Sequence, residues 1–365
     1  MRTSYIDRLV NTLQDGGLDA MLICPSEELA FFAGFSPIMC ERFQGLFIKQ
    51  DGRMFYFCNL LTGDEVRHAA GGRFPVYTWS DNESMTQCIG KIFDAEELSG
   101  KTIGLNSTAQ AFNILDISAA TGARFQNGVG VLEEARIIKT EEELRCLRRA
   151  AAIADDGFRA VLPLIRPGMT EGDVRNLLTD KMEKLGGTDA GALVASGPNA
   201  GFPHYCSYDR ILQKGDGIIM DFGCIVDGLH SDISRTVFLG PVSQRQRYLY
   251  HLLLKAQEAA VEAAVEGAWI PDIDAAARKV LDEAGYGHTS ITRVGHGIGY
   301  MTHEAPCINA LNRRKLQRGM CFSIEPGIYL PGDLGIRIED IVAINLEGQR
   351  EVLNRAPKNM IVLDV

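Results

Sequence analysis

The chain has 365 residues, of which 46% are hydrophobic and 23% charged, and a formal net charge of −10. This balance is typical of a globular protein, and the length is enough for two domains. An acidic chain without a basic run is a poor match for nucleic acid, and no apolar run approaches the roughly 20 residues of a membrane span. We therefore expect neither a nucleic-acid nor a membrane partner.

The cysteines point to the compartment. There are nine, they are scattered, and no two are spaced as Cys-x-x-Cys. This pattern argues against a disulfide framework, and the polar N-terminus does not resemble a signal peptide. We expect a cytoplasmic protein.

The first 130 or so residues alternate between short strands and helices. Strand patterns cover 19–24, 47–48, 54–57 and 102–105, and helical patterns cover about 4–15, 83–94 and 108–120. Asp51-Gly52, between two of the strands, is a strong hairpin signal. We predict a small α/β domain over residues 1–132, and we find no catalytic constellation in it.

From residue 139 onward, one pattern occurs twice at a spacing of about 100 residues. Capping boxes, Thr140 with Glu143 and Ser243 with Gln246, begin two long helices. Each long helix, about 140–165 and 243–266, is followed by a shorter one, about 170–185 and 271–284, and then by Gly-rich, strand-like sequence. We predict a second domain, residues 139–365, with an internal duplication of two facing helix-plus-sheet halves. Two unrelated helical hairpins are the alternative.

Two aspartates lie on one predicted hairpin, formed by strand patterns at 218–223 and 233–239 and by the turn residues Asp227-Gly228. A turn centred there places Asp221 opposite Ser234, so that Asp221 and Asp232 are diagonal neighbours roughly 7–8 Å apart. Two carboxylates this close on a half-buried sheet repel each other unless a cation lies between them. The alternative is a pair of solvated surface aspartates.

Two later stretches add an imidazole and two carboxylates. His296 lies in a Gly-rich segment that matches neither a dinucleotide-binding loop nor a His-Glu-x-x-His zinc motif. In strand geometry, one residue pair shares a face in each of two stretches, Ser323 with Glu325 and Arg337 with Glu339. Taken singly, these stretches also fit a structural histidine and a structural Glu–Arg ion pair.

Together, these segments supply four carboxylates and one imidazole: Asp221, Asp232, His296, Glu325 and Glu339. Such an oxygen-rich set suits hard or borderline divalent cations such as Mn²⁺, Fe²⁺ or Co²⁺, with Zn²⁺ as a further option. Carboxylates can also bridge two ions about 3.5–4 Å apart, as in two-metal hydrolases.

These stretches resemble the pita-bread-fold metallopeptidases, which include Xaa-Pro dipeptidase (prolidase), aminopeptidase P and methionine aminopeptidase. The matching segments follow the family's order and spacing: Asp221–Gly223, Ser231–Thr236, Gly295–Gly299 with His303-Glu304, Ile324–Tyr329 and Gly335–Asp340. The resemblance spans about 139–365, and residues 1–130 resemble the N-terminal domain of creatinase, prolidase and aminopeptidase P. It implies an α/β (α+β) chain whose C-terminal domain has pseudo-twofold symmetry.

The resemblance also implies a chemistry. The five residues above would hold two divalent metal ions, with Mn²⁺ as the first choice, and a metal-bridging hydroxide would hydrolyse Xaa-Pro peptide bonds. Glu325 would pass the proton to the leaving nitrogen, and His204 and His303 would donate hydrogen bonds to developing negative charge. Arg337 would pair with a ligand carboxylate or with the substrate carboxylate. A metal-free, creatinase-type reaction is disfavoured because all five ligand positions are filled.

Two positions depart from the family pattern. Cys307 stands where several dipeptidase-type relatives carry an arginine for the substrate carboxylate, and Leu229 stands where many have tyrosine. Both dipeptidase and aminopeptidase P activity therefore remain open. A metal-dependent hydrolase or lyase of a small non-peptide metabolite is the alternative enzyme, and a catalytically inactive binding module is a third reading. The expected partners are a small peptide with proline at its second position and a second copy of the chain in a homodimer.

Overall fold

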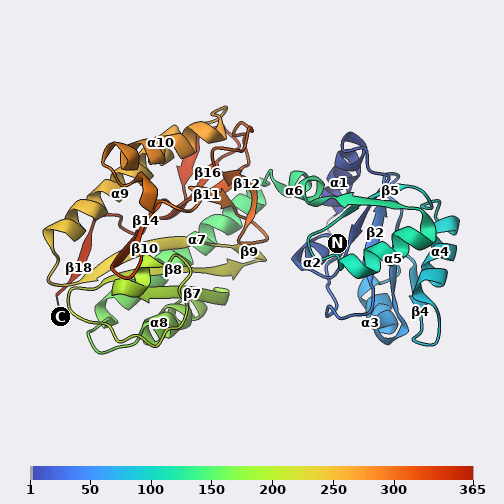
Figure 1. Ribbon diagram of the computed structural model, residues 1–365, viewed down its shortest axis with the longest axis horizontal. Coiled ribbons are helices and arrows are strands. Elements are labelled where there is room, and N and C mark those ends of the chain that lie inside the picture. Colours follow the sequence, from blue (N-terminus) through green and yellow to red (C-terminus); the bar gives the residue numbers. More distant parts are fainter. Residues whose placement is uncertain (1–2, 365) are drawn as a thin grey trace. The chain divides into compact units, whose positions relative to one another are not determined.

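The computed structural model describes residues 3–364, and the chain divides into two compact units, Met1–Arg136 and Ile137–Val365 (Figure 1). Each unit is built around hydrophobic clusters of its own. No helix within residues 3–364 combines the length and apolar character that a membrane span requires.

Unit 1 contains a six-stranded mixed sheet in the order β4-β3-β2-β1-β5-β6. Its strands are β1 (Ala20–Ile23), β2 (Gly45–Lys49), β3 (Met54–Asn59), β4 (Val76–Trp79), β5 (Thr102–Leu105) and β6 (Arg124–Asn127). Its helices are α1 (Thr3–Asp15), α2 (Glu27–Ala33), α3 (Leu60–Ala70), α4 (Met85–Ala95), α5 (Ala111–Thr121) and α6 (Val129–Arg136). The strands bury phenylalanine side chains such as Phe47, Phe55 and Phe57 against α4 and α5.

The predicted elements of unit 1 are present, and others were missed. The hairpin at Asp51-Gly52 is confirmed: β2 and β3 pair antiparallel, and Gly52 takes the positive φ of 81° that glycine tolerates best. The missed elements are α2, α3, α6, β4 and β6. These are short, between 4 and 11 residues, and α3 has Gly63 in its interior and a mixed polar and apolar sequence. Such elements form because neighbouring structure packs on them, and periodicity alone does not reveal them.

Unit 2 has two helix pairs. The first is α7 (Glu141–Val161) with α8 (Glu171–Lys184), and the second is α9 (Gln244–Ala263) with α10 (Ile270–Glu283). Unit 2 also contains short 3₁₀ helices, η1 (Leu162–Leu164), η2 (Gly197–Gly201) and η3 (Gly287–Thr289). Both predicted capping boxes are formed, at Thr140 and at Ser243. The long helices end slightly earlier than predicted, at Val161 and Ala263. Pro271 lies in the first turn of α10, where its missing N–H costs nothing.

Three sheets complete unit 2. The first runs β18-β10-β8-β7 with β9 paired to β8, the second runs β12-β11-β13-β16-β17, and the third is the pair β14-β15. Strand bounds are β7 (Thr188–Ser196), β8 (Gly217–Val226), β9 (Leu229–His230), β10 (Ile233–Leu239), β11 (Gly295–Gly297), β12 (Glu304–Ile308), β13 (Cys321–Ile324), β14 (Gly327–Leu330), β15 (Leu334–Arg337), β16 (Asp340–Ile344), β17 (Arg350–Val352) and β18 (Ile361–Leu363).

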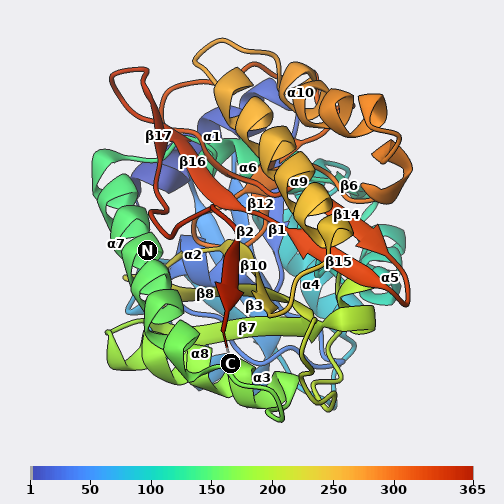
Figure 2. The same cartoon turned by 90° about the vertical axis from the view of Figure 1, so that its left-hand side faces the viewer.

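The helix pairs lie outside and the sheets inside (Figures 1 and 2). Phe158 of α7 and Leu178 of α8 are buried with Phe222 of β8, whereas Leu253 of α9 and Ala277 of α10 belong to the cluster that holds Phe322 of β13. Each half therefore packs a helix pair on its own sheet. The predicted α/β fold with an internal duplication is confirmed.

The predicted register of the aspartate hairpin is also confirmed. Ser234 lies opposite Asp221, and the pairing continues to Val226 opposite Leu229 around the turn. Asp227 and Gly228 have φ values of 51° and 81°, as a two-residue type I′ turn requires. The local pattern thus placed Asp221 correctly in β8 and Asp232 next to the start of the strand that pairs with it.

Candidate metal centre

The hairpin brings Asp221 and Asp232 together on one face. Asp221 is in β8, and Asp232 immediately precedes β10. Gly223 makes the close approach possible, because a Cβ there would lie 1.9 Å from the carbonyl oxygen of Ser231. Burial raises the pKa of Asp232 well above its usual range, and the neighbouring charges of Asp221 and Glu325 raise it further.

Glu325 and Glu339 lie at two breaks between strands. The chain leaves the five-stranded sheet after β13, enters the two-stranded sheet at β14, and returns from β15 to β16. Glu325 falls in the first gap and Glu339 in the second. The prediction of continuous strands through these positions was therefore wrong. At both breaks, the backbone N–H bonds to another segment: that of Glu325 donates to the Val294 carbonyl at 2.7 Å, and that of Glu339 donates to the Ser234 carbonyl of the hairpin at 3.0 Å.

His296, in β11, is fixed in one tautomer. Its Nδ1 lies 3.0 Å from the carbonyl oxygen of Gly297, which can only accept, so Nδ1 carries the proton and donates. In the neutral ring, Nε2 then presents a lone pair. Yet Nε2 lies 3.1 Å from Glu325 Oε1 and 3.6 Å from Asp232 Oδ2. Acceptors that face one another need a proton or a cation between them.

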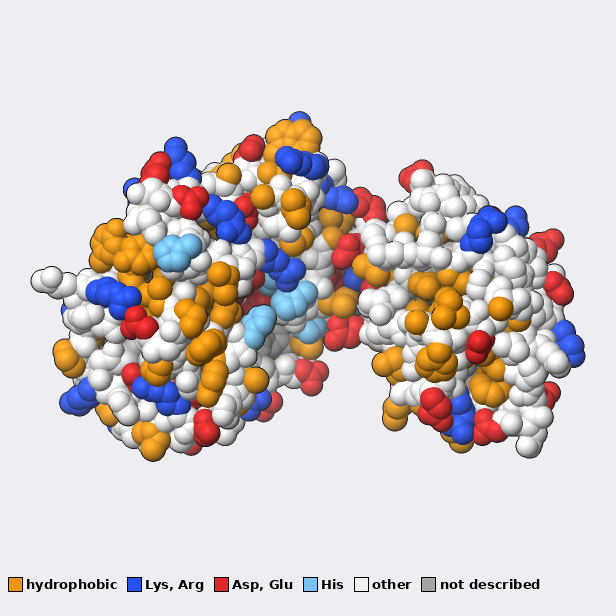
Figure 3. Space-filling model, in the orientation of Figure 1, with side chains coloured by type: hydrophobic (Ala, Val, Ile, Leu, Met, Phe, Trp, Pro, Cys, Tyr) orange, Lys and Arg blue, Asp and Glu red, His pale blue; other side chains and the backbone are white. Residues whose placement is uncertain are grey.

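Glu339 is held at one oxygen and free at the other. Ser234 Oγ donates to Glu339 Oε2 at 2.7 Å, and the Glu339 backbone N–H donates to the Ser234 carbonyl at 3.0 Å. Oε1 is buried and has no hydrogen-bond partner among the described residues. Ligand atoms of Asp232, His296 and Glu339 all lie within 4.8 Å of one another. Figure 3 shows histidine side chains gathered beside a hollow on this unit.

The cluster carries more negative than positive charge. Burial raises the pKa of Glu339 well above its usual range, and the charges of Asp232 and Glu325 add to this. Burial also acts to raise the pKa of Glu325, but when the His296 ring is protonated at both nitrogens, its hydrogen bond and charge, together with the charge of Arg337, outweigh burial and leave that pKa lowered. Holding several ionised carboxylates here requires added positive charge.

Arg337, which is 3% exposed, ties the hairpin to the strand breaks. Its Nη2 donates to Asp221 Oδ2 at 2.5 Å, and its Nε donates to Ser234 Oγ at 2.9 Å. Nη1 donates to the hydroxyl of Tyr329 at 3.0 Å and to the carbonyl of Pro203 at 3.2 Å. Of the two roles expected for Arg337, the structure shows the pairing with a carboxylate of the cluster.

The two further histidines lie at different distances from this cluster. The ring of His303 meets that of His296 edge to face, with centroids 4.3 Å apart. Desolvation, His296 and Arg293 together lower the pKa of His303 to about 4. His204 is exposed and lines an open cavity of about 570 Å³ together with Phe202, Tyr205 and Ile291. This cavity begins beside Pro203, the residue that Arg337 contacts.

The sequence pattern assigned no role in the site to two residues that the structure places there, Ser234 and Arg293. Ser234 shares the strand face of Asp232, and the same two-residue alternation would have found it. Arg293 Nη1 lies 3.9 Å from Cys307 Sγ, and no carboxylate among the described residues pairs with this half-buried guanidinium. Its position two residues before Gly295 would have been the available signal. Arg293, which precedes β11, thus places a guanidinium beside Cys307.

Comparison with known proteins assigns the family. The pattern of metallopeptidase family M24 matches residues 145–345, and that of the creatinase/prolidase N-terminal domain matches residues 6–138. The chain belongs to metallopeptidase family M24. This M24 chain is 33% identical over 354 residues to an Xaa-Pro dipeptidase of Lactobacillus helveticus, covering 94% of this chain and 95% of the relative.

Solved structures agree with this M24 assignment. Dipeptidase PepE from Mycobacterium ulcerans has a TM-score of 0.92 at 31% identity, covering 100% of this chain and 98% of that one. The Xaa-Pro dipeptidase from Bacillus anthracis has a TM-score of 0.85 at 30% identity, covering 99% of each chain. The predicted family and the predicted metallopeptidase class are confirmed.

Membership in a metallopeptidase family implies divalent metal ions, and the residues fit them. A cation would satisfy three features of the cluster. It would bind the free Oε1 of Glu339 and the lone pair of His296 Nε2, and its charge would stabilise the ionised form of Asp232, whose pKa is raised. The donors are carboxylate oxygens and one imidazole nitrogen, a set that suits borderline divalent ions.

Proposed function

We propose that this M24 metallopeptidase is an Xaa-Pro dipeptidase with a dinuclear metal centre. Asp221, Asp232, His296, Glu325 and Glu339 would be the ligands, with Mn²⁺ as the first candidate and Co²⁺, Fe²⁺ or Zn²⁺ as alternatives. The observation that carries the proposal is the lone pair of His296 Nε2, which faces Glu325 and Asp232 in a buried, carboxylate-rich cluster. The names of the relatives from Lactobacillus helveticus and Bacillus anthracis supply the Xaa-Pro specificity.

Divalent ions bound there would lower the pKa of a coordinated water toward neutrality and so supply a hydroxide, and would polarise the scissile carbonyl. Side chains of the protein would transfer the proton and orient the ligands. Glu325 lies beside His296 in the cluster, where its carboxylate can take a proton from the attacking water and pass it to the leaving nitrogen. Arg337 holds Asp221, and Ser234 holds Glu339, so the ligands are oriented before any substrate arrives.

Two histidines are proposed to stabilise charge that develops during the reaction. His303 stays neutral at physiological pH because its pKa is about 4, so its N–H donates a hydrogen bond to developing negative charge without carrying a full charge of its own. His204 lies on the wall of the adjoining cavity, where it can reach a bound peptide. Cleavage should therefore depend on both residues through kcat more than through KM.

The choice of dipeptidase over aminopeptidase rests on Arg293. A half-buried guanidinium that pairs with no carboxylate among residues 3–364 suits an anionic ligand, and the C-terminal carboxylate of a dipeptide is such a group. Arg293 is close enough to His303 to contribute to its lowered pKa, which places this positive charge at the edge of the cluster. A longer peptide would put an uncharged amide there.

We also propose a homodimer, as expected from the family resemblance, and the cytoplasmic location stays a prediction.

The apolar side of the cavity, formed by Phe202 and Ile291, would hold the side chain of the residue before proline.

The function is tested by a peptide-length series. Purified protein with added Mn²⁺ would be assayed on Xaa-Pro, on Xaa-Pro-amide, on an Xaa-Pro-Xaa tripeptide and on small non-peptide amides. We expect efficient turnover of Xaa-Pro and of none of the other three substrates. Efficient tripeptide cleavage would replace the dipeptidase proposal with an aminopeptidase, and turnover restricted to a non-peptide amide would reject peptide hydrolysis.

A further inference from the structure

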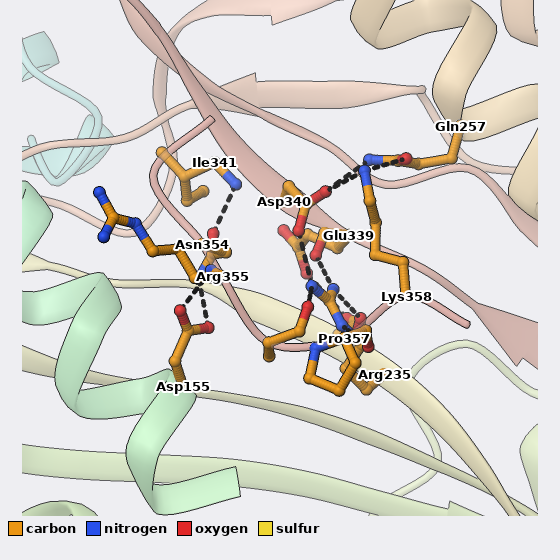
Figure 4. A network of polar contacts seen from close by, with 12 residues as sticks. Asp155, Arg235, Gln257, Glu339, Asp340, Ile341, Asn354, Arg355, Pro357 and Lys358 are labelled. Carbon is orange, nitrogen blue, oxygen red and sulfur yellow. Dashed lines mark hydrogen bonds and ion pairs between the residues drawn. The ribbon is translucent and has the colours of Figure 1, made fainter. Parts of the chain in front are cut away.

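Behind the carboxylate cluster lies a second polar network that the proposed chemistry does not use (Figure 4). Its centre is Arg235, a residue of β10 whose side chain is 1% exposed. Arg235 points away from the face that carries Asp232 and Ser234, because successive strand residues alternate between faces. A buried cation on this side of the sheet needs acceptors for each of its donors.

All five guanidinium N–H groups of Arg235 have acceptors. Nη1 donates to the carbonyls of Ser234 at 3.0 Å and Glu339 at 2.5 Å. Nη2 donates to Asp340 Oδ1 at 2.7 Å and to the carbonyl of Ala356 at 2.9 Å, and Nε donates to the carbonyl of Pro357 at 3.1 Å. With no free donor, this planar group can occupy one position only.

Asp340, the carboxylate partner of Arg235, also has contacts at its second oxygen. Its Oδ2 accepts from Gln257 Nε2 of α9 at 3.0 Å and forms an ion pair with Lys358 Nζ at 2.9 Å. Asp340 thus balances part of the charge of Arg235 and Lys358 in an interior where an unpaired charge would be costly. It also immediately follows Glu339, so any shift of Asp340 moves the ligand beside it.

The C-terminal segment 353–358, called here the C-terminal clamp, holds the start of β16, which follows Glu339. Asn354 Oδ1 accepts from the backbone N–H of Ile341 at 2.8 Å, and the Leu353 N–H donates to the Ile341 carbonyl at 2.8 Å. Asp155 of α7 accepts from the Arg355 N–H and fixes the clamp to the helix. Figure 4 shows Asn354 and Ile341 near Asp340 and Glu339, with Asp155 beyond them.

We propose that Arg235 is a positioning residue for the metal centre, because it joins the break that holds Glu339, between β15 and β16, to the hairpin strand and to the C-terminal clamp. Glu339 is fixed on one side by Ser234, through both its carboxylate and its N–H, and on the other by Arg235, through its carbonyl. Ligand position sets metal affinity, and loss of groups behind the ligands typically costs about 10–100-fold in affinity. This inference rests on the metal centre proposed above.

The test is a titration of metal-free, full-length protein with Mn²⁺ by calorimetry, well below its unfolding temperature. Arg235→Lys keeps the charge but cannot fill the five acceptors. We expect it to bind Mn²⁺ about 10–100-fold more weakly than the wild type. The matched control is Arg210→Lys, since Arg210 forms a similar two-point pair with Asp216, and its printed hydrogen bonds go to Ser196 and Asp216, which are not proposed ligands. That control should keep wild-type affinity.

Asp340→Asn provides a second variant if Arg235→Lys does not fold, because it keeps the size of the side chain and one acceptor. It should also lose affinity. Wild-type Mn²⁺ affinity in either folded variant would overturn the inference, as would an equal loss in Arg210→Lys. A wild-type protein that binds no Mn²⁺ would instead reject the metal centre itself, so the two failures are distinguishable.

Discussion

His296 and Glu339, beside Asp232, each use one polar atom in a hydrogen bond and keep a second polar atom free. His296 donates from Nδ1 to a backbone carbonyl and leaves Nε2 facing carboxylates, and Glu339 accepts at Oε2 from Ser234 and leaves Oε1 bare. This arrangement stores unfavourable charge that a cation would relieve. At the scale of single residues, the cluster is therefore poorly adapted for stability and well adapted for metal binding.

Asp232→Asn tests this conflict, because stability and metal affinity should change in opposite directions. A carboxyl whose pKa is raised in the folded protein binds its proton more tightly folded than unfolded, so its ionised form destabilises the metal-free protein at neutral pH. We expect the variant to have a higher free energy of unfolding in chelator than the wild type. Mn²⁺ affinity should fall.

The sign of the pH dependence follows. As the pH falls through the raised pKa of Asp232, the wild-type carboxyl takes up its proton and the advantage of Asn should shrink. Thermal unfolding in chelator from pH 8 to pH 5 measures this. An Asn variant that is less stable than the wild type at pH 8 would contradict the electrostatic argument.

Arg293→Ala tests the proposed carboxylate contact. A hydrogen bond to a charged group contributes about 1.5–3 kcal/mol, so kcat/KM for a dipeptide with a free carboxylate should fall roughly 10- to 150-fold. For the same dipeptide with an amidated C-terminus, the variant and the wild type should be similar. An equal loss on both substrates would show that Arg293 supports the fold and does not read the carboxylate.

At the scale of elements, the site depends on how closely strands can approach. The β8–β10 hairpin holds both aspartates, and the breaks between β13 and β14 and between β15 and β16 hold both glutamates. Gly223 and Gly295 occupy places where a Cβ would lie 1.9 Å from a carbonyl oxygen of the adjacent segment. Small residues at these two positions are thus a packing requirement of the site.

Two facing glycines allow a matched test of this requirement. Gly191 pairs with Gly223 across β7 and β8, but a Cβ on Gly191 would meet nothing within 4 Å. We expect Gly223→Ala to lower the free energy of unfolding by about 1–3 kcal/mol, because the Ser231 carbonyl must move. Gly191→Ala should change it by less than about 0.5 kcal/mol. Chemical denaturation measures both, and equal effects would refute the close-approach argument.

At the scale of the whole molecule, the chain contains two compact units, and the proposed ligands all belong to unit 2. The cluster around Phe47 stabilises unit 1, whereas those around Phe222 and Phe322 stabilise unit 2. A ligand that binds only the folded form stabilises the part of the protein that holds it.

Calorimetry should therefore show two unfolding transitions, and Mn²⁺ should raise only the one that belongs to unit 2. At 100 times the dissociation constant, the gain is about 2.7 kcal/mol. The Asp232→Asn variant serves as the control and should lose the shift. A single transition that moves as a whole would show that the two units unfold together.

The sequence by itself determined the features that local chemistry encodes. The Asp227-Gly228 turn and the two-residue alternation placed Asp221 opposite Ser234, and the capping boxes at Thr140 and Ser243 began the long helices where the structure has them. Turn and cap signals act over a few residues, so a single chain is enough to read them.

Tertiary structure alone decided which distant groups meet. Ser234 holds Glu339 across 105 positions of the chain, Arg235 contacts the Ala356 carbonyl across 121, and Arg293 lies beside Cys307 on the adjacent strand. These contacts depend on how sheets and strand breaks pack, and no local pattern specifies that packing. For the same reason, the short elements α2, α3 and α6 escaped prediction, whereas the long, strongly periodic α7 did not.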